Sequence, residues 1–175
     1  METCPSPRRP AEVRVKIKEN TDFGEFMTTE NKTLIEEANI RDVIDRRIKA
    51  VRDKDIEALL SNHAPEVLLF DVVDPLQYTG VDMVRERAGK WFSSFQSPIG
   101  YEVRDLSIAT GGDAAFCHYL YHVSGTLEGG VEISMWVRAT VCFRRINGKW
   151  MIVHEHQSVP FNGETGKASL DLKPE

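Results

Sequence analysis

The stretch RRINGKWMIVHEHQSVPF, residues 144–161, contains the clearest structural signal in this sequence. Asn-Gly between two runs of alternating apolar residues is the strongest short-range signal for a two-residue β-hairpin. Asn147 and Gly148 therefore predict an antiparallel pair of strands over 131–146 and 149–159. Gly111-Gly112 and Gly129-Gly130 interrupt the preceding sequence in a similar way, which predicts two further strands, 101–110 and 114–127. The second half of the chain is thus predicted to be an antiparallel meander.

The first half of the chain carries helical signals. Apolar residues at steps of three and four predict a helix over 33–52, and they are Ile40, Val43, Ile44, Ile48 and Val51. Asp55 is placed to cap a short second helix, and residues 81–95 predict a third. VLLF, residues 67–70, reads as a buried strand that ends in the turn-rich loop 71–80. Helices followed by an antiparallel meander indicate an α+β fold.

Composition places this chain among ordinary globular proteins. It has 175 residues, of which 41% are hydrophobic and 28% charged. We expect one domain over 33–165, between an N-terminal tail (1–32) and a C-terminal tail (166–175). The net charge of -5 predicts no nucleic-acid partner and no membrane partner. The three cysteines form neither a disulfide framework nor a metal-binding pair, and no apolar run resembles a secretory signal, so we expect a cytoplasmic protein.

The two hairpins predict which side chains share a face, because directly opposed residues in a ladder point to the same side. With two-residue loops, Glu155 lies opposite Thr140, and Arg138 lies opposite both Gln157 and Tyr121. One face then carries Tyr119, Tyr121, Trp136, Arg138, Thr140, Glu155 and Gln157 over a floor of Cys117, Cys142 and Val153. This face predicts a small-molecule pocket with an Arg138–Glu155 ion pair. The alternative is that the pair only stabilises the fold, with no ligand.

The opposite face combines apolar residues with histidines. We expect it to form a homodimer contact through His118, Val141, His154 and His156, because no predicted helix remains to cover it. A zinc site is the alternative reading, since HxH spacing on a strand occurs in metal sites. His118 and His154 lie two strands apart, about 10 Å between Cα atoms, which is wide for one ion. We therefore expect no bound metal.

Several motifs carry a resemblance to a known superfamily. They are DIEALLSNHAPEVLLFD (55–71), DMVRERAGKW (82–91), GGDAAFCHYLYHVSGTL (111–127) and RRINGKWMIVHEHQS (144–158). Over residues 35–165 the chain resembles the NTF2-like superfamily. This includes SnoaL-like polyketide cyclases, ketosteroid isomerases and the association domain of calcium/calmodulin-dependent kinase II. The resemblance implies a cone in which three helices pack on a strongly curved antiparallel sheet that encloses a pocket.

The resemblance also assigns individual positions. It puts Asp71 where the ketosteroid isomerases have their general base. Arg47 and Thr140 stand where those enzymes have a tyrosine and a protonated acid, so steroid isomerisation is not expected. Tyr121 and Gln157 occupy positions that are pocket arginines in the kinase association domain.

These observations lead to two functional hypotheses. In the first, the protein is a cofactor-free isomerase, cyclase or dehydratase with Asp71 as base. Arg138, Tyr119 and Tyr121 would hold a substrate oxygen beside Glu155, while Tyr78 and Trp91 would close the mouth of the pocket. In the second, the chain is a non-catalytic domain for ligand binding or oligomerisation.

Overall fold

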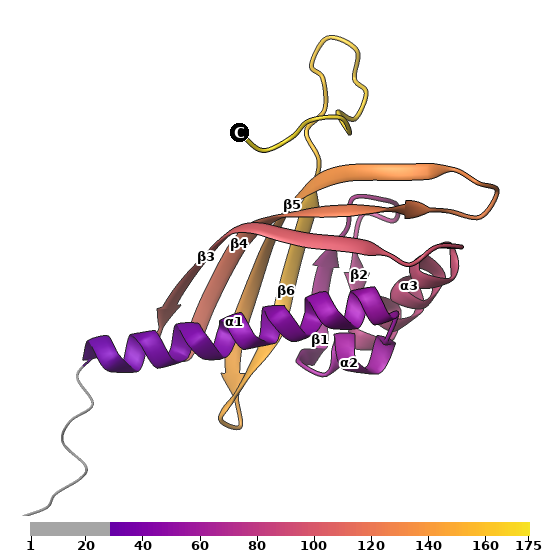
Figure 1. Cartoon of the computed structure of the whole chain (residues 1–175). Helices are drawn as coiled ribbons and strands as arrows, with labels where there is room; N and C mark the ends of the chain where they lie inside the picture. Colours follow the sequence, from indigo (N-terminus) through magenta and orange to yellow (C-terminus); the bar gives the residue numbers. More distant parts are fainter. Residues whose placement is uncertain (1–28) are drawn as a thin grey trace, which may run out of the picture.

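A computed structural model describes residues 29–175 of the chain (Figure 1). The helices are α1 (Thr29–Asp53), α2 (Ile56–Leu60) and α3 (Val81–Ser93). The strands are β1 (His63–Phe70), β2 (Tyr78–Thr79), β3 (Gly100–Gly111), β4 (Ala114–Thr126), β5 (Glu132–Ile146) and β6 (Lys149–Ser158). Helix α1 begins at Thr29 rather than Thr33, and the expected tail lies mostly outside the described residues. Of the helices in the described part, none is long and apolar enough to cross a membrane.

The strands form one curved sheet in the order β2-β1-β6-β5-β4-β3. β1 pairs with β6 in parallel, and all other neighbours are antiparallel. Figure 1 shows α1 lying across one face of the sheet, with α2 and α3 beside it near β1 and β2. The expected α+β cone is confirmed. The last residues of the chain project beyond the end of β6, away from the three helices.

The hydrophobic core lies between the helices and the concave face of the sheet. Ile40 and Ile44 of α1 are almost fully buried, as the three-and-four spacing predicts. Val141, Phe143 and Ile152 cover the facing sheet surface and are equally inaccessible. Burial of this apolar surface is the dominant stabilising contribution, so the concave face must stay apolar except where polar groups are paired.

The β4–β5 hairpin differs from the prediction by one residue. The loop consists of three residues, Glu128, Gly129 and Gly130, and is closed by the Leu127 amide donating to the Val131 carbonyl at 2.8 Å. Both glycines have positive φ. Tyr121 consequently lies opposite Val137, and Tyr119 lies opposite Ala139. A one-residue shift exchanges the two faces of a strand, so β5 presents the opposite set of side chains from the one predicted.

The β5–β6 hairpin has the predicted Asn147-Gly148 turn, with Ile146 opposite Lys149. A β-bulge then interrupts the ladder: Phe143 pairs with Ile152, but Cys142 pairs with His154. The extra residue, Val153, reverses the alternation of β6 beyond it. Glu155 therefore lies opposite Val141 instead of Thr140. The two departures compensate, and Glu155 and Gln157 still face the same side as Tyr119 and Tyr121.

Candidate functional site

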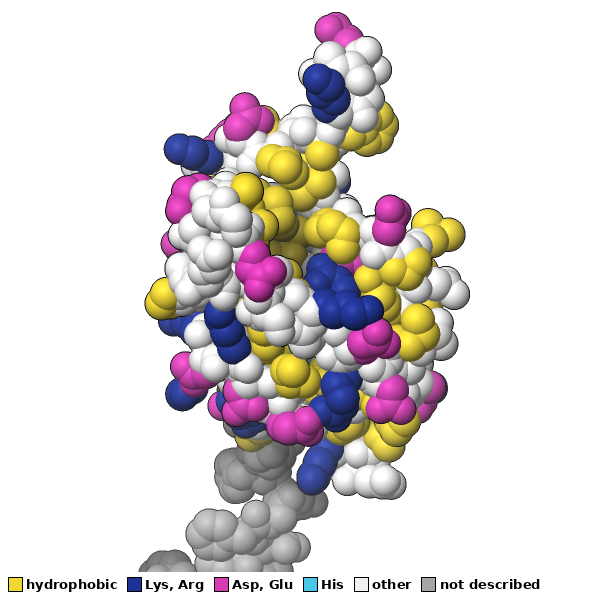
Figure 2. All heavy atoms as spheres, turned by 90° about the vertical axis from the view of Figure 1, so that its right-hand side faces the viewer, with side chains coloured by type: hydrophobic (Ala, Val, Ile, Leu, Met, Phe, Trp, Pro, Cys, Tyr) yellow, Lys and Arg dark blue, Asp and Glu magenta, His cyan; other side chains and the backbone are white. Residues whose placement is uncertain are grey.

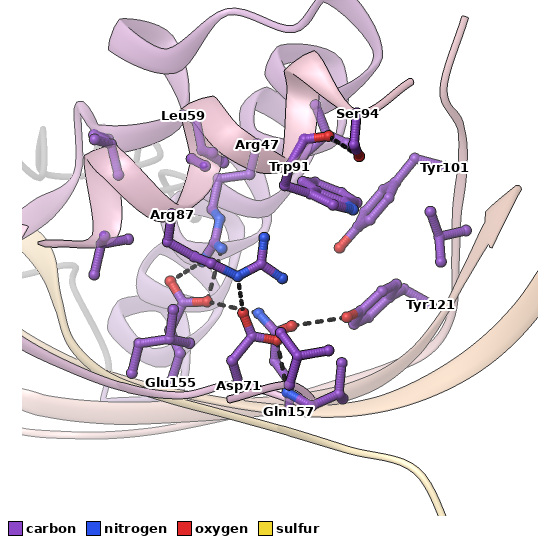
Figure 3. A pocket seen from close by; sticks show the side chains of 18 of the residues that line it. Arg47, Leu59, Asp71, Arg87, Trp91, Ser94, Tyr101, Tyr121, Glu155 and Gln157 are labelled. Carbon is purple, nitrogen blue, oxygen red and sulfur yellow. Dashed lines mark hydrogen bonds and ion pairs between the residues drawn. The ribbon is translucent and has the colours of Figure 1, made fainter. Parts of the chain in front are cut away.

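A cavity of about 260 Å³ lies between the concave face of the sheet and the helices (Figure 3). Most of its wall is apolar and includes Val51, Leu59, Val84, Val123 and Met135. Val73 lines the cavity and is 51% exposed, so the cavity opens beside the loop between β1 and β2. Viewed from the side, hydrophobic side chains also gather in a hollow below the projecting C-terminal segment (Figure 2). A concave, mostly apolar site with few polar groups is the usual form of a small-molecule pocket.

Glu155 is the buried anion at one end of this cavity. Arg47 of α1 holds it with both terminal nitrogens, Nη1 at 2.8 Å from Oε1 and Nη2 at 2.9 Å from Oε2. The Nε2 atom of His63, at the start of β1, lies 2.7 Å from Oε1. Its Nδ1 atom is buried and has no hydrogen-bond partner among the described residues. Side chains from α1 and β1 therefore meet at a carboxylate carried by β6.

The surroundings of Glu155 keep it ionised. Burial alone would raise the pKa of Glu155, because it penalises the charged form. The charge of Arg47 and the hydrogen bond to His63 outweigh burial and hold the pKa well below its usual range. The pKa of Arg47 is raised: burial opposes its charge, but Glu155 more than compensates. The two groups form a charged pair throughout the physiological pH range.

Asp71 forms a second ion pair on the cavity wall. It follows β1 directly, and its side chain is only 6% exposed. Oδ2 lies 2.7 Å from Nε of Arg87 on α3, and Oδ1 accepts the backbone N–H of Val72 at 2.6 Å. The terminal nitrogens of Arg87 form no hydrogen bond or ion pair with a side chain in the described part of the chain. Figure 3 shows them directed into the cavity, toward the side where the tyrosines lie.

Two stacked tyrosines form the opposite wall. The rings of Tyr101 on β3 and Tyr121 on β4 lie 5.0 Å apart. The Tyr121 hydroxyl donates to Oε1 of Gln157 at 2.8 Å, whereas the Tyr101 hydroxyl has no hydrogen-bond partner within residues 29–175. Figure 3 shows this free hydroxyl directed into the cavity. Burial raises the pKa of both phenols well above the usual value, so both remain neutral donors.

Several predicted site residues lie elsewhere. The altered β4–β5 register turns Trp136, Arg138 and Thr140 to the convex face of the sheet, where Arg138 and Thr140 are exposed. The predicted Arg138–Glu155 pair is therefore wrong, because Arg47 and His63 occupy the carboxylate. On the predicted floor, Cys117 stays on the concave side, while Cys142 faces the other way.

The other predicted residues divide between the cavity and its surroundings. Asp71, Trp91, Tyr121, Glu155 and Gln157 line the cavity. Tyr119 is buried on the same face of the sheet but is absent from the cavity wall. Tyr78 lies in β2 and donates its hydroxyl to the Asp74 carbonyl at 2.8 Å, outside the wall.

Four polar residues of the cavity, Arg47, His63, Arg87 and Tyr101, were not among the predicted site residues. The sequence contains a signal for two of them, Arg47 and Arg87. Arg47 lies four residues from both Val43 and Val51, inside the buried stripe of α1. Arg87 similarly falls between Val84 and Trp91 on α3. A cation inside an apolar stripe needs a buried partner, which is a sign of a site. His63 and Tyr101 carry no such signal in the sequence.

The described residues contain no group of three or more His, Cys, Asp and Glu side chains arranged to hold a metal ion. The two thiols at 117 and 142 are free. Burial raises the pKa of Cys117 to about 12, which makes it a poor ligand and nucleophile at neutral pH.

Comparisons with known proteins agree with this architecture. An NTF2-like protein of unknown function from Pseudomonas putida is 34% identical, with a TM-score of 0.75 over 81% of this chain and 99% of that one. A ketosteroid isomerase-like protein from Erwinia carotovora shares 20% identity over 69% and 93% of the two chains, with a TM-score of 0.60. A candidate calcium/calmodulin-dependent protein kinase II association domain from Xanthomonas campestris shares 16% identity over 68% and 84%, with a TM-score of 0.59.

No curated protein matches the chain. The sequence profile of the SnoaL-like domain matches residues 40–162, which include every polar residue of the cavity described above. The chain therefore belongs to the SnoaL-like family, within the NTF2-like fold.

Proposed function

We propose that this protein is a cofactor-free enzyme that moves a proton next to the carbonyl group of a small, mostly apolar molecule. Isomerisation, aldol-type cyclisation and dehydration of carbonyl compounds commonly proceed through such a step. The observation that carries the proposal is Asp71, a nearly buried carboxylate on the wall of an apolar cavity. The ketosteroid isomerase-like relative supports the reaction class by its name.

The chemical step balances without any further reactant. A carboxylate oxygen of Asp71 takes a proton from the carbon beside the carbonyl, so that the C–H bond breaks and an O–H bond forms. The electron pair moves onto the carbonyl oxygen and gives an enolate. Returning the proton to another carbon or expelling a leaving group completes the reaction.

Arg87 gives this step an electrostatic rationale. In the resting site its positive charge is balanced by Asp71. When Asp71 becomes neutral, the negative charge has moved to the enolate oxygen, and the same guanidinium can balance it there. A preorganised donor of this kind typically contributes about 3 kcal/mol to stabilising the transition state. Glu155, tied to Arg47 and His63, would hold the site together and would not accept the proton.

The proposal is tested by hydrogen exchange, which requires no knowledge of the natural product. The protein is incubated with 1-tetralone in D₂O, and loss of the proton signal at the carbon beside the carbonyl is followed by NMR. We expect Asp71→Asn to slow the enzyme-dependent exchange by about 10²–10⁴-fold. Asp45→Asn, at an exposed position of α1, is the matched control and should exchange at the wild-type rate. Exchange that persists in Asp71→Asn would exclude Asp71 as the base.

A second candidate function is ligand binding without turnover. One observation favours it: Arg47 pairs with Glu155 and Arg87 pairs with Asp71, so every charge in the pocket is already balanced. A domain of this kind would bind 1-tetralone but show no enzyme-dependent exchange with any carbonyl compound.

We further propose that the protein is a cytoplasmic homodimer that associates through the convex face of the sheet. His118, His154 and His156 lie on this face, with Phe116 47% exposed beside them. Val141, expected on the same surface, instead points into the core and is fully buried. Within residues 29–175, no helix covers the convex face. An uncovered sheet face with apolar side chains is a common site of association.

A further inference from the structure

The polar groups of the cavity separate into those already paired and those still free. Arg47 and His63 both bind Glu155, and Gln157 accepts a hydrogen bond from Tyr121. Besides Nδ1 of His63 and the indole N–H of Trp91, two sets of donors have no hydrogen-bond partner within the described residues: the Tyr101 hydroxyl and the terminal nitrogens of Arg87. Figure 3 shows both directed into the same part of the cavity, from opposite walls.

Two convergent donors in an apolar cavity define a place for one acceptor oxygen. Tyr101 is preorganised as a donor. Stacking on Tyr121 fixes its ring, and burial raises the pKa of its phenol and so keeps it protonated. Arg87 is fixed by its ion pair with Asp71. An oxygen bound between the two would also lie near Asp71, the group that the proposed function uses as base.

The charge balance restricts what this oxygen can belong to. Arg47 and Arg87 carry two positive charges, and Glu155 and Asp71 carry two negative charges. An anionic ligand would bring an unbalanced charge into an apolar cavity, which is strongly unfavourable. The volume of about 260 Å³ lies below the usual range for drug-sized ligands, which limits the ligand to one or two rings.

We propose that Tyr101 and Arg87 form the oxygen-binding site of the pocket, and that their ligand is an uncharged ketone with one or two rings. The inference rests on the proposed function and adds its substrate class and its specificity-determining residue. Tyr101 acts by positioning: it directs the carbonyl oxygen so that the neighbouring carbon faces Asp71.

The test compares the binding of matched probes by isothermal titration. 1-Tetralone and tetralin differ only in the carbonyl group, and 1-naphthoate presents a carboxylate on a similar ring system. We expect the wild type to bind 1-tetralone more tightly than tetralin and not to bind 1-naphthoate. Tyr101→Phe should weaken 1-tetralone about three- to tenfold, the usual effect of one neutral hydrogen bond, and leave tetralin unchanged.

Tyr119→Phe is the matched control, because it removes the same hydroxyl from a buried tyrosine that does not line the cavity. It should leave the preference for 1-tetralone over tetralin at the wild-type value. Phenylalanine retains the stacking ring at position 101, so the variant should fold, and its thermal melt checks this.

Three results would overturn the inference. One is that Tyr101→Phe leaves the preference for 1-tetralone unchanged, and another is that wild type binds 1-naphthoate more tightly than 1-tetralone. The third is that 1-tetralone does not bind at all. None of them would remove the proposed function, provided that some carbonyl compound still shows Asp71-dependent exchange. If no carbonyl compound shows Asp71-dependent exchange, but Tyr101→Phe weakens the binding of 1-tetralone as expected, the protein binds its ligand without turnover.

Discussion

Among single residues, Glu155 depends on its neighbours to keep a charge in the protein interior. Its carboxylate is buried, and Arg47 and His63 approach it from α1 and β1. Replacing a well-packed ion pair by apolar groups is often harmless, but removing one partner leaves the other charge buried without compensation. The free energy of unfolding should therefore depend on Glu155 even if the group takes no part in catalysis.

We expect Glu155→Gln to lower the free energy of unfolding by about 3–5 kcal/mol, because Arg47 then remains buried and charged. Urea denaturation followed by circular dichroism measures this change. Glu86→Gln, which removes an exposed ion pair with Lys90, is the control and should have little effect. A loss in Glu155→Gln no larger than in the control would contradict the interpretation of the Glu155 cluster.

The contribution of Glu155 to the free energy of unfolding depends on pH. The folded-state pKa of Glu155 lies below its unfolded value, so the stabilisation it contributes is present above the unfolded pKa, about 4.3. That contribution is lost as the pH falls from there toward the folded pKa. The stability difference between wild type and Glu155→Gln should therefore shrink below about pH 4.

The resemblance gave the correct place for Asp71, whereas Glu155 and Gln157 lie on the predicted side only because the three-residue β4–β5 loop and the bulge at Val153 cancel each other. Asp71, Glu155 and Gln157 were placed on the cavity wall, as the structure has them. Arg138 was misplaced because its position depended on the length of one loop. Tyr101 could not be identified, because whether a tyrosine hydroxyl has a partner depends on three-dimensional contacts that no local pattern records.

At the scale of elements, the helices and strands followed from the sequence almost completely, because they depend on local periodicity. The ladder registers did not. Asn-Gly specifies a two-residue turn strongly, and the β5–β6 turn has that form. Gly-Gly is compatible with two- and three-residue loops alike, and no turn motif in the sequence marks the bulge at Val153.

Gly125 combines a positive φ with close contact to neighbouring atoms. It lies near the end of β4 with φ 150°, and a Cβ atom there would lie 2.8 Å from Oγ of Ser97 and 3.0 Å from the Phe95 ring. We expect Gly125→Ala to lower the free energy of unfolding by about 1–3 kcal/mol.

Gly111→Ala is the matched control for this change, since its Cβ would meet nothing within 4 Å. Thermal unfolding of the two variants should show a lower melting temperature for Gly125→Ala only. Equal melting temperatures would mean that β4 can relax near its end, and that the contact with Ser97 and Phe95 does not constrain it.

In the whole molecule, the helices of the described part pack on one face of the sheet, so its two faces lie in different environments. The concave face is covered by helices and holds the cavity, while the convex face has no helical cover in the described residues. The resemblance to NTF2-like proteins predicted this cone, although local patterns alone reach only as far as an α+β class. Self-association through the convex face remains a prediction, and it is one that a single charge can test.

We expect the wild type to have the mass of two chains in solution and Phe116→Asp to have the mass of one. Phe116 is 47% exposed on the convex face, in the same row of the sheet as Cys142 and His154. A two-fold contact would bring the introduced carboxylate into an apolar interface twice, once from each chain. Sedimentation velocity over a range of concentrations measures the mass.

Leu76→Asp, a change at a 91% exposed position of the loop between β1 and β2, is the control and should stay dimeric. Wild type that sediments as a single chain at every concentration, or dissociation caused by Leu76→Asp and not by Phe116→Asp, would exclude the convex face as the site of association.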